Sequence, residues 1–185
     1  MLRTASLVLA SLAGIVIAVL GLRRAERAAA EAENVPIQDQ IDRALADPLD
    51  GWWVAEVLDA FGYLEPEFGY RLTKVYLHFR GTSLWYEGPV FDFVIEHDPD
   101  DTGSIHADLW VHQDRDSQVE PMVFAVNDVL RARDPGLPLP DPQRSHLEKA
   151  EVLEAITIWA VGLRELAPDI LRGAWPDGVW VGHPW

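Results

Sequence analysis

The chain of 185 residues is long enough for one soluble domain with additional segments, and its 49% of hydrophobic residues can form a sizeable core. Thirty acidic residues against fifteen basic ones give a formal net charge of −15, which repels phosphate backbones and argues against a nucleic-acid partner. The absence of cysteine excludes disulfides, thiolate zinc sites and cysteine nucleophiles.

The start of the chain has the pattern of a membrane segment. Residues 4–22 carry no charge, and Arg3 and Arg23 bound this apolar run. At about 1.5 Å per residue, a helix of this length just crosses a hydrocarbon core of roughly 30 Å. The pattern therefore predicts a transmembrane or signal-anchor helix over residues 1–22.

The arginines behind this run bear on cleavage and on orientation. Arg23, Arg24 and Arg27 separate the apolar run from the nearest small-residue cleavage site, which disfavours removal of a signal peptide. More positive charges follow the apolar run than precede it, which favours a single-pass protein of the cell membrane whose soluble domain is cytoplasmic. A secreted domain, released by cleavage, is the alternative. Residues 23–34 predict a helical juxtamembrane stalk, and residues 35–185 the acidic domain.

Two short helices are expected at the start of the domain. Residues 35–46 place apolar side chains at helical spacing and are followed by Pro48, which ends the pattern. Residues 51–62 form a second apolar stripe, with Asp50 as the candidate N-cap and Gly62 as the stop.

From Tyr70 the hydrophobic period changes to two, which predicts a three-stranded antiparallel meander with one apolar and one polar face. Gly81 and Thr82 are expected to form the first tight turn. Along the second strand the apolar parity switches, and a β-bulge at residues 87–89 is expected to supply the extra residue. The third strand is predicted within residues 104–112.

Two helices are expected after the sheet. The first is predicted to run from Pro121 to the neighbourhood of Arg133, and the second to open at a capping box formed by Ser145 and Glu148. Pro168 is expected to kink or split the second helix. This order of elements predicts an α+β fold in which the two C-terminal helices pack on one face of the sheet.

The polar face of the predicted sheet gathers the side chains that could bind a partner or a metal. They are Lys74, Tyr76, His78, Asp92, Glu96, His106, Asp108, Trp110 and His112. Imidazoles and carboxylates bind divalent metals or transfer protons near neutral pH. The candidate metal ligands are Asp92, His106 and Asp108, and the two aspartates, if adjacent, would need a cation or a shared proton. Side chains along one strand are spread out at about 3.4 Å per residue, so a single ion could reach only close neighbours.

The first hypothesis is a membrane-anchored, non-enzymatic acidic module whose polar face binds a basic protein partner without a cofactor. No catalytic motif is present, and the charge attracts cationic surfaces. Small acidic domains with several tryptophans are similar in general character to bacterial toxin-neutralising (immunity) proteins, a similarity of character and not of motif. The alternative is a hydrolase that depends on a divalent metal. Its site would be built from His78, His106, Asp108, His112 and either Asp92 or Glu96.

Overall fold

The computed structural model describes residues 35–78, 81–98, 104–111, 122–140 and 147–175. The chain separates into two units between residues 36 and 37, and every described helix and strand lies in the second unit. The predicted membrane helix over residues 1–22 and the stalk over residues 23–34 lie outside the described part. Among the described residues, no helix is both long enough and apolar enough to cross a membrane.

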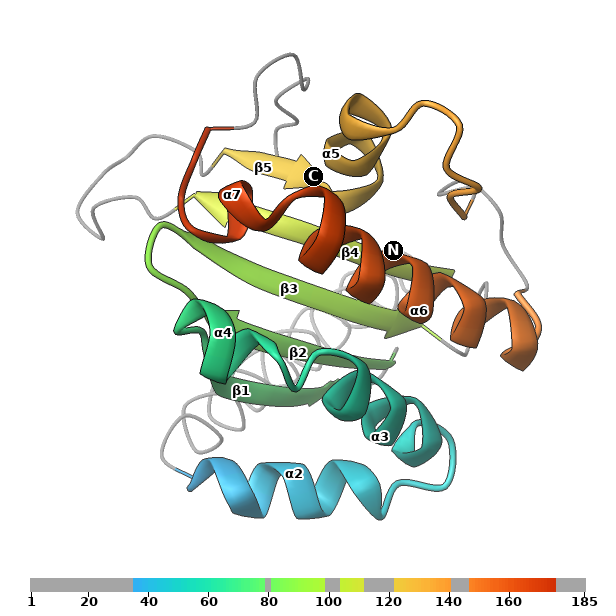
Figure 1. The fold of residues 1–185 in the computed structure, drawn as a ribbon. Helices are drawn as coiled ribbons and strands as arrows, with labels where there is room; N and C mark the ends of the chain where they lie inside the picture. The colour runs from blue at the N-terminus through green and yellow to red at the C-terminus, as the bar shows by residue number, and fades with distance from the viewer. Residues whose placement is uncertain (1–34, 79–80, 99–103, 112–121, 141–146, 176–185) are drawn as a thin grey trace, which may run out of the picture. The chain divides into compact units, whose positions relative to one another are not determined.

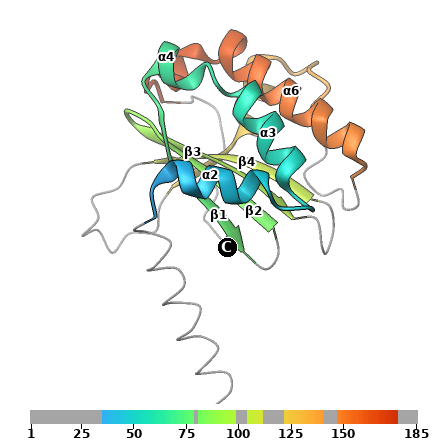
Figure 2. The ribbon, with the colours of Figure 1, turned by 90° about the horizontal axis from the view of Figure 1, so that it is seen from below.

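The second unit has an α+β fold built on a five-stranded antiparallel sheet in the order β1-β2-β3-β4-β5 (Figure 1). The strands are β1 (Arg71–His78), β2 (Gly81–Glu87), β3 (Phe91–Asp98), β4 (Ser104–Val111) and β5 (Val123–Ala125). The helices are α2 (Ile37–Leu45), α3 (Gly51–Ala60), α4 (Leu64–Phe68), α5 (Val126–Arg133), α6 (Lys149–Leu166) and α7 (Pro168–Leu171). Figures 1 and 2 show α3, α4 and α6 over one face of the sheet and α2 along its β1 side.

The core lies between this covered face and the helices. The inward residues of the strands are buried as the alternation predicts, and Leu84, Phe93 and Leu109 are fully buried. The apolar stripes of α3 and α6 meet them, with Phe61 and Leu163 also fully buried. The α+β class predicted from the order of elements is therefore confirmed.

The described residues form five strands where three were predicted, and the main cause is the segment 87–89. This segment is not a bulge within one strand: Glu87 is the last residue of β2, and residues 88–90 connect it to β3. Tyr86 and Phe93 pair across the turn, so both point into the core, and the reversal of the chain explains the switch in parity. Gly88 packs against the ring of Tyr70 so closely that a Cβ would not fit.

Two further boundaries near the sheet differ from prediction. Gly81 and Thr82, predicted as a tight turn, are the first residues of β2, and Gly81 pairs with the last residue of β1. The helix predicted from Pro121 begins only at Val126, because the three residues before it pair with β4 as the short strand β5. A three-residue strand completed by pairing carries too little alternation to be recognised locally.

The last long helix begins one turn later than predicted. Its capping box is formed by Glu148 and Glu151, and the Glu148 N–H donates to Glu151 Oε2 at 2.8 Å. Ser145, predicted as the cap, lies outside the described residues. The prediction that Pro168 would split the helix is confirmed, because α6 ends before it and α7 starts at it.

A bulge does occur, on the edge strand β1. The register of β1 against β2 shifts between Leu72 and Lys74. Just beyond the shift, the Val75 N–H donates to the side-chain oxygen of Gln40 on α2 at 3.0 Å. The helix α2 thus covers an edge whose backbone donors would otherwise be open to another strand.

Candidate functional site

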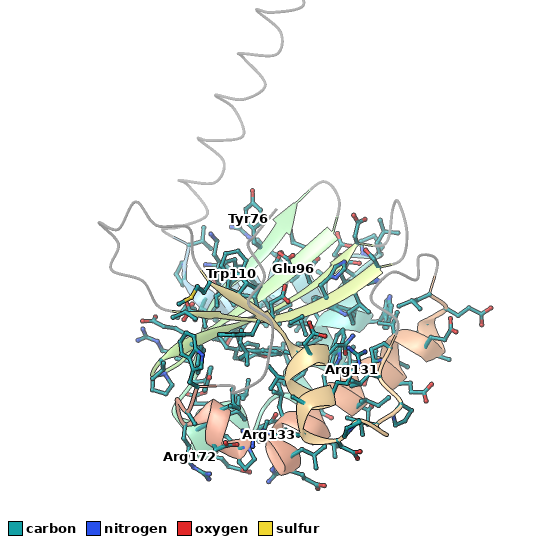
Figure 3. All side chains as sticks on the ribbon, turned by 90° about the horizontal axis from the view of Figure 1, so that it is seen from above. Tyr76, Glu96, Trp110, Arg131, Arg133 and Arg172 are labelled. Carbon is teal, nitrogen blue, oxygen red and sulfur yellow. The ribbon has the colours of Figure 1, made fainter. Side chains whose placement is uncertain are left out.

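The candidate site is the face of the sheet that is turned away from α3 and α6, which we call the outer face. Its described members are Lys74, Tyr76, Ser83, Trp85, Asp92, Val94, Glu96, His106, Asp108 and Trp110. In Figure 3, Tyr76, Glu96 and Trp110 project to one side of the sheet, while Arg131 and Arg172 lie on the other side. Strand pairing thus gathers residues from four strands on one surface.

Most of the residues predicted for the binding surface lie on this face. His112 falls outside the described residues, and of His78 only the backbone pairing with Gly81 is described. Ser83 and Trp85 of β2 were not predicted. The signal that could have identified them is their alternation in the sequence with Leu84 and Tyr86, whose side chains are buried in the core, although Ser83 is itself only 3% exposed.

Asp92 and Asp108 lie on the adjacent strands β3 and β4, as the alternation allowed, but they are not directly opposite each other. Asp92 lies opposite Trp110, two residues from Asp108 along β4. The carboxylates whose charges act on Asp108 are instead those of Glu96 on β3 and Asp128 on α5. The direction and register of β3, which the turn after β2 determines, set this arrangement.

Asp108 is the titrating group of the outer face. Burial of its carboxyl group, reinforced by the negative charges of Glu96 and Asp128, raises the pKa of Asp108 to about 7. Near neutral pH this side chain therefore exchanges between carboxylic acid and carboxylate. A proton can neutralise it, and so can a cationic group placed on the outer face by a partner.

Two tryptophans cover the middle of the outer face. The ring centroids of Trp85 and Trp110 lie 5.6 Å apart with their planes at 47°. Val94, the cross-strand partner of Trp85, is only 2% exposed. The indole Nε1 of Trp110 is buried and has no hydrogen-bond partner among the described residues. Indole rings beside carboxylates are the groups that attract cations, and tryptophans are enriched at binding hot spots.

Local interactions orient the polar groups around this pair. The Ser83 hydroxyl donates to Glu96 Oε1 at 2.8 Å, which holds that carboxylate on the outer face. Toward the β1 edge, Lys74 Nζ lies 5.3 Å from the centre of the Tyr76 ring. The outer face therefore combines an oriented carboxylate, a titrating one and an aromatic pair.

The predicted metal ligands share the outer face but do not converge. In the strand register none of Asp92, His106 and Asp108 lies opposite another of the three. No group of three His, Asp or Glu side chains within the described residues could hold a metal ion. The hydrolase alternative therefore has no three-ligand centre in this part of the chain.

A second polar cluster, which the sequence did not predict, lies inside the domain. Asp50, expected to cap α3, makes no side-chain cap hydrogen bond and is 3% exposed. Its carboxylate accepts a hydrogen bond of 2.6 Å from the Thr82 hydroxyl and lies 3.0 Å from Nδ1 of His97. Trp53 stacks on the imidazole, with ring centroids 5.4 Å apart.

This buried cluster joins elements and is not arranged as a reaction centre. Thr82 and His97 are cross-strand partners of β2 and β3, and Asp50 ties them to the start of α3. Both side chains contact the carboxylate, so the imidazole is not placed to activate the hydroxyl as a nucleophile. All three residues are at most 5% exposed. The sequence carries no local signal for the cluster, because its members lie 32 and 47 residues from Asp50.

Comparison of the chain with protein-family models, with curated proteins and with solved structures found no match. Its function is therefore inferred from the chemistry of its own residues.

Proposed function

We propose that the protein is a non-enzymatic binding module whose outer face recognises a basic protein partner, and that residues 4–22 hold it at a membrane. The observation that carries the first part is the placement of Trp85 and Trp110 beside Glu96 and Asp108 on one face of the sheet. The formal charge of −15 adds a long-range attraction for a positively charged surface.

A lysine or arginine side chain suits this arrangement better than a neutral group does. Its charge is stabilised by the face of an indole ring, typically by about 0.5–2 kcal/mol, and by a neighbouring carboxylate. A cation placed near Asp108 also favours the carboxylate form of that side chain, which burial disfavours in the free protein. Capture of a basic toxin or enzyme by an acidic, inhibitor-like module is the kind of role that these features support.

The polar groups of the domain also support binding over catalysis. On the outer face, Glu96 and His106 are cross-strand partners, whereas Asp92 and Asp108 lie at other positions along the two strands and are not opposite either of them. The buried His97–Asp50 pair is enclosed by Trp53 and by the core. The Ser83 hydroxyl does lie beside the Glu96 carboxylate, but Ser83 is only 3% exposed, so its oxygen is not open to a substrate.

The binding proposal is tested by calorimetric titration of the full chain with a lysine- and arginine-rich peptide. We expect the affinity to fall about tenfold or more when the salt concentration rises from about 50 to 500 mM. Trp85→Ala and Glu96→Gln should each weaken binding about threefold or more at low salt.

The matched control is Glu165→Gln, which removes one exposed carboxylate from α6 on the helical side of the domain. It should change the affinity less than about twofold. If it weakens binding as much as Glu96→Gln does, or if Trp85→Ala has no effect, the peptide binds through overall charge and the outer face is not the recognition surface.

The membrane proposal is tested separately by labelling. The chain has no cysteine, so a Glu165→Cys variant carries one thiol at an exposed position of α6. In intact cells that express the full chain, a membrane-impermeant thiol reagent should leave this thiol unlabelled until the cells are permeabilised. If the thiol is labelled in intact cells, the domain lies outside the cell. If the chain is recovered in the soluble fraction and not with the membranes, the anchor is contradicted.

A further inference from the structure

A pocket of about 420 Å³ opens at the β1 side of the domain, between α2, α3 and β1. Figure 1 shows these elements grouped at one side of the sheet, together with α4. Four aliphatic side chains line the pocket and pack against the core behind them: Ile37, Ile41, Leu58 and Leu72. A volume of this size lies within the range of small-molecule sites, and apolar walls are typical of them.

Tyr86 forms another part of the wall and brings a polar group that lacks a partner. The residue is 6% exposed, and its hydroxyl has no hydrogen-bond partner among the described residues. Burial raises the pKa of Tyr86 well above its usual range, so the hydroxyl keeps its proton and can donate. By contrast, the neighbouring Tyr63 hydroxyl donates to the Ala160 carbonyl oxygen at 2.9 Å. Tyr86 therefore lines the pocket as a residue, while its hydroxyl is enclosed by the domain and has almost no accessible surface.

The pocket also carries one cation and one carboxylate, Arg71 and Glu65. Arg71 Nη2 contacts the Glu87 carboxylate at 3.2 Å, but both side chains are exposed, so the pair is weak. The guanidinium has five N–H donors and can hold a second carboxylate as well. Glu65 is exposed and makes no ion pair with any described residue.

These two charges restrict the kind of ligand. A ligand with only a carboxylate would meet Arg71 but would enter a strongly negative domain. A ligand with only an ammonium group would leave Arg71 without a new partner. A zwitterion is neutral as a whole and can match both groups at the same time.

We propose that this pocket binds a small zwitterionic apolar ligand of the class of apolar amino acids and their dipeptides. The apolar side chains lie among the aliphatic residues of α2, α3 and β1, the carboxylate meets Arg71, and the ammonium group meets Glu65. This site is separate from the outer face and does not depend on the function proposed for it.

The test is a titration of the full chain with leucyl-leucine, followed by calorimetry and by backbone amide shifts. We expect saturable binding below about 10 mM, with shifts concentrated in α2, α3 and β1. Acetyl-leucyl-leucine, which lacks the ammonium group, and leucyl-leucine amide, which lacks the carboxylate, should each bind about fivefold more weakly. Decanoate is the probe for a fatty acid in the same pocket.

Variants assign the two ends of the ligand. Arg71→Gln and Glu65→Gln should each weaken binding of leucyl-leucine about fivefold, while the far-ultraviolet circular dichroism stays unchanged. The control Arg131→Gln, on α5, should have no effect. The proposal is overturned if leucyl-leucine does not bind by about 10 mM, if the blocked dipeptides bind equally well, or if decanoate binds in its place.

Discussion

At the residue scale, the protonation of Asp108 depends on its burial and on the charges near it at the outer face. In the free protein its carboxyl group is partly buried and faces the charges of Glu96 and Asp128, which raises its pKa to about 7. The carboxylate form is therefore unfavourable in the folded chain and ordinary in the unfolded chain. We infer that Asp108 lowers the free energy of unfolding at high pH, where its carboxylate supplies a negative charge at the proposed binding surface.

Asp108→Asn should raise the free energy of unfolding at pH 8 by about 2 kcal/mol. This is about half of what the raised pKa implies at about 1.36 kcal/mol per unit, since the side chain is only partly buried. The pKa of Asp108 in the folded chain lies above the ordinary aspartate pKa of 3.8. The stability that the folded chain has with Asp108 protonated is therefore fully present below about pH 4 and is lost as the pH rises through about 7. Urea denaturation from pH 4 to 8 should therefore show a gap between variant and parent that opens with pH.

The control for this prediction is Asp59→Asn, an exposed position on α3. Its effect should stay within about 0.5 kcal/mol at every pH. A gap for Asp108→Asn that is constant with pH would mean that its carboxylate is not the titrating group.

At the scale of elements, the helices α3 and α6 are attached to the sheet by packing, and α3 also by one buried polar joint. Asp50, at the start of α3, binds Thr82 of β2 and His97 of β3 inside the core. Such a joint specifies where the helix starts relative to the strands, because any other placement leaves three polar groups without partners.

Asp50→Ala should cost about 3 kcal/mol of unfolding free energy, because it leaves the Thr82 hydroxyl and the His97 imidazole unpartnered in the core. Asp47→Ala is the matched change in the same linker. Asp47 is half-buried and its Oδ1 accepts the backbone N–H groups of Leu49 at 2.8 Å and of Asp50 at 3.0 Å, so its loss should cost about 1 kcal/mol. Chemical denaturation of both variants measures the difference, and equal losses would show that the buried joint adds nothing beyond capping.

At the scale of the whole molecule, the excess of acidic residues acts in two opposite ways. Self-repulsion of like charges destabilises the compact state, and the same charges attract a basic partner. Salt screens both interactions, with a Debye length of about 30 Å at 0.01 M and about 3 Å at 1 M.

Raising NaCl from about 50 to 500 mM should therefore raise the melting temperature of the free chain by a few degrees, because repulsion is screened. The same change should weaken binding of the basic peptide. Differential scanning calorimetry measures the first effect. A Glu165→Lys variant, which lowers the net negative charge by two, should show a smaller response to salt, and a melting temperature that falls with salt would contradict the argument.

The candidate site was predictable to the extent that it depends on strand alternation. His106 and Trp110 were assigned to the polar face because the side-chain period of a strand is local. The partners of these residues were not predictable. The apolar parity switches in the same way whether the chain reverses at residues 87–89 or carries one inserted residue there. Only the pairing of β2 with β3 distinguishes the two cases. The side-chain role of Asp50 was misassigned for a similar reason. An aspartate at the start of a helix looks the same in the sequence whether its carboxylate caps that helix or turns into the core.

The sequence by itself determined the α+β class, the acidic character and part of the sheet's polar face, because composition and short periods express these properties directly. The tertiary structure alone decided that the charges of Glu96 and Asp128 act on Asp108, that Asp50 joins β2 and β3, and that a pocket forms beside β1. Each of these depends on contacts between segments far apart in the chain. The free energy of such contacts comes from packing and burial in three dimensions, which no local pattern encodes.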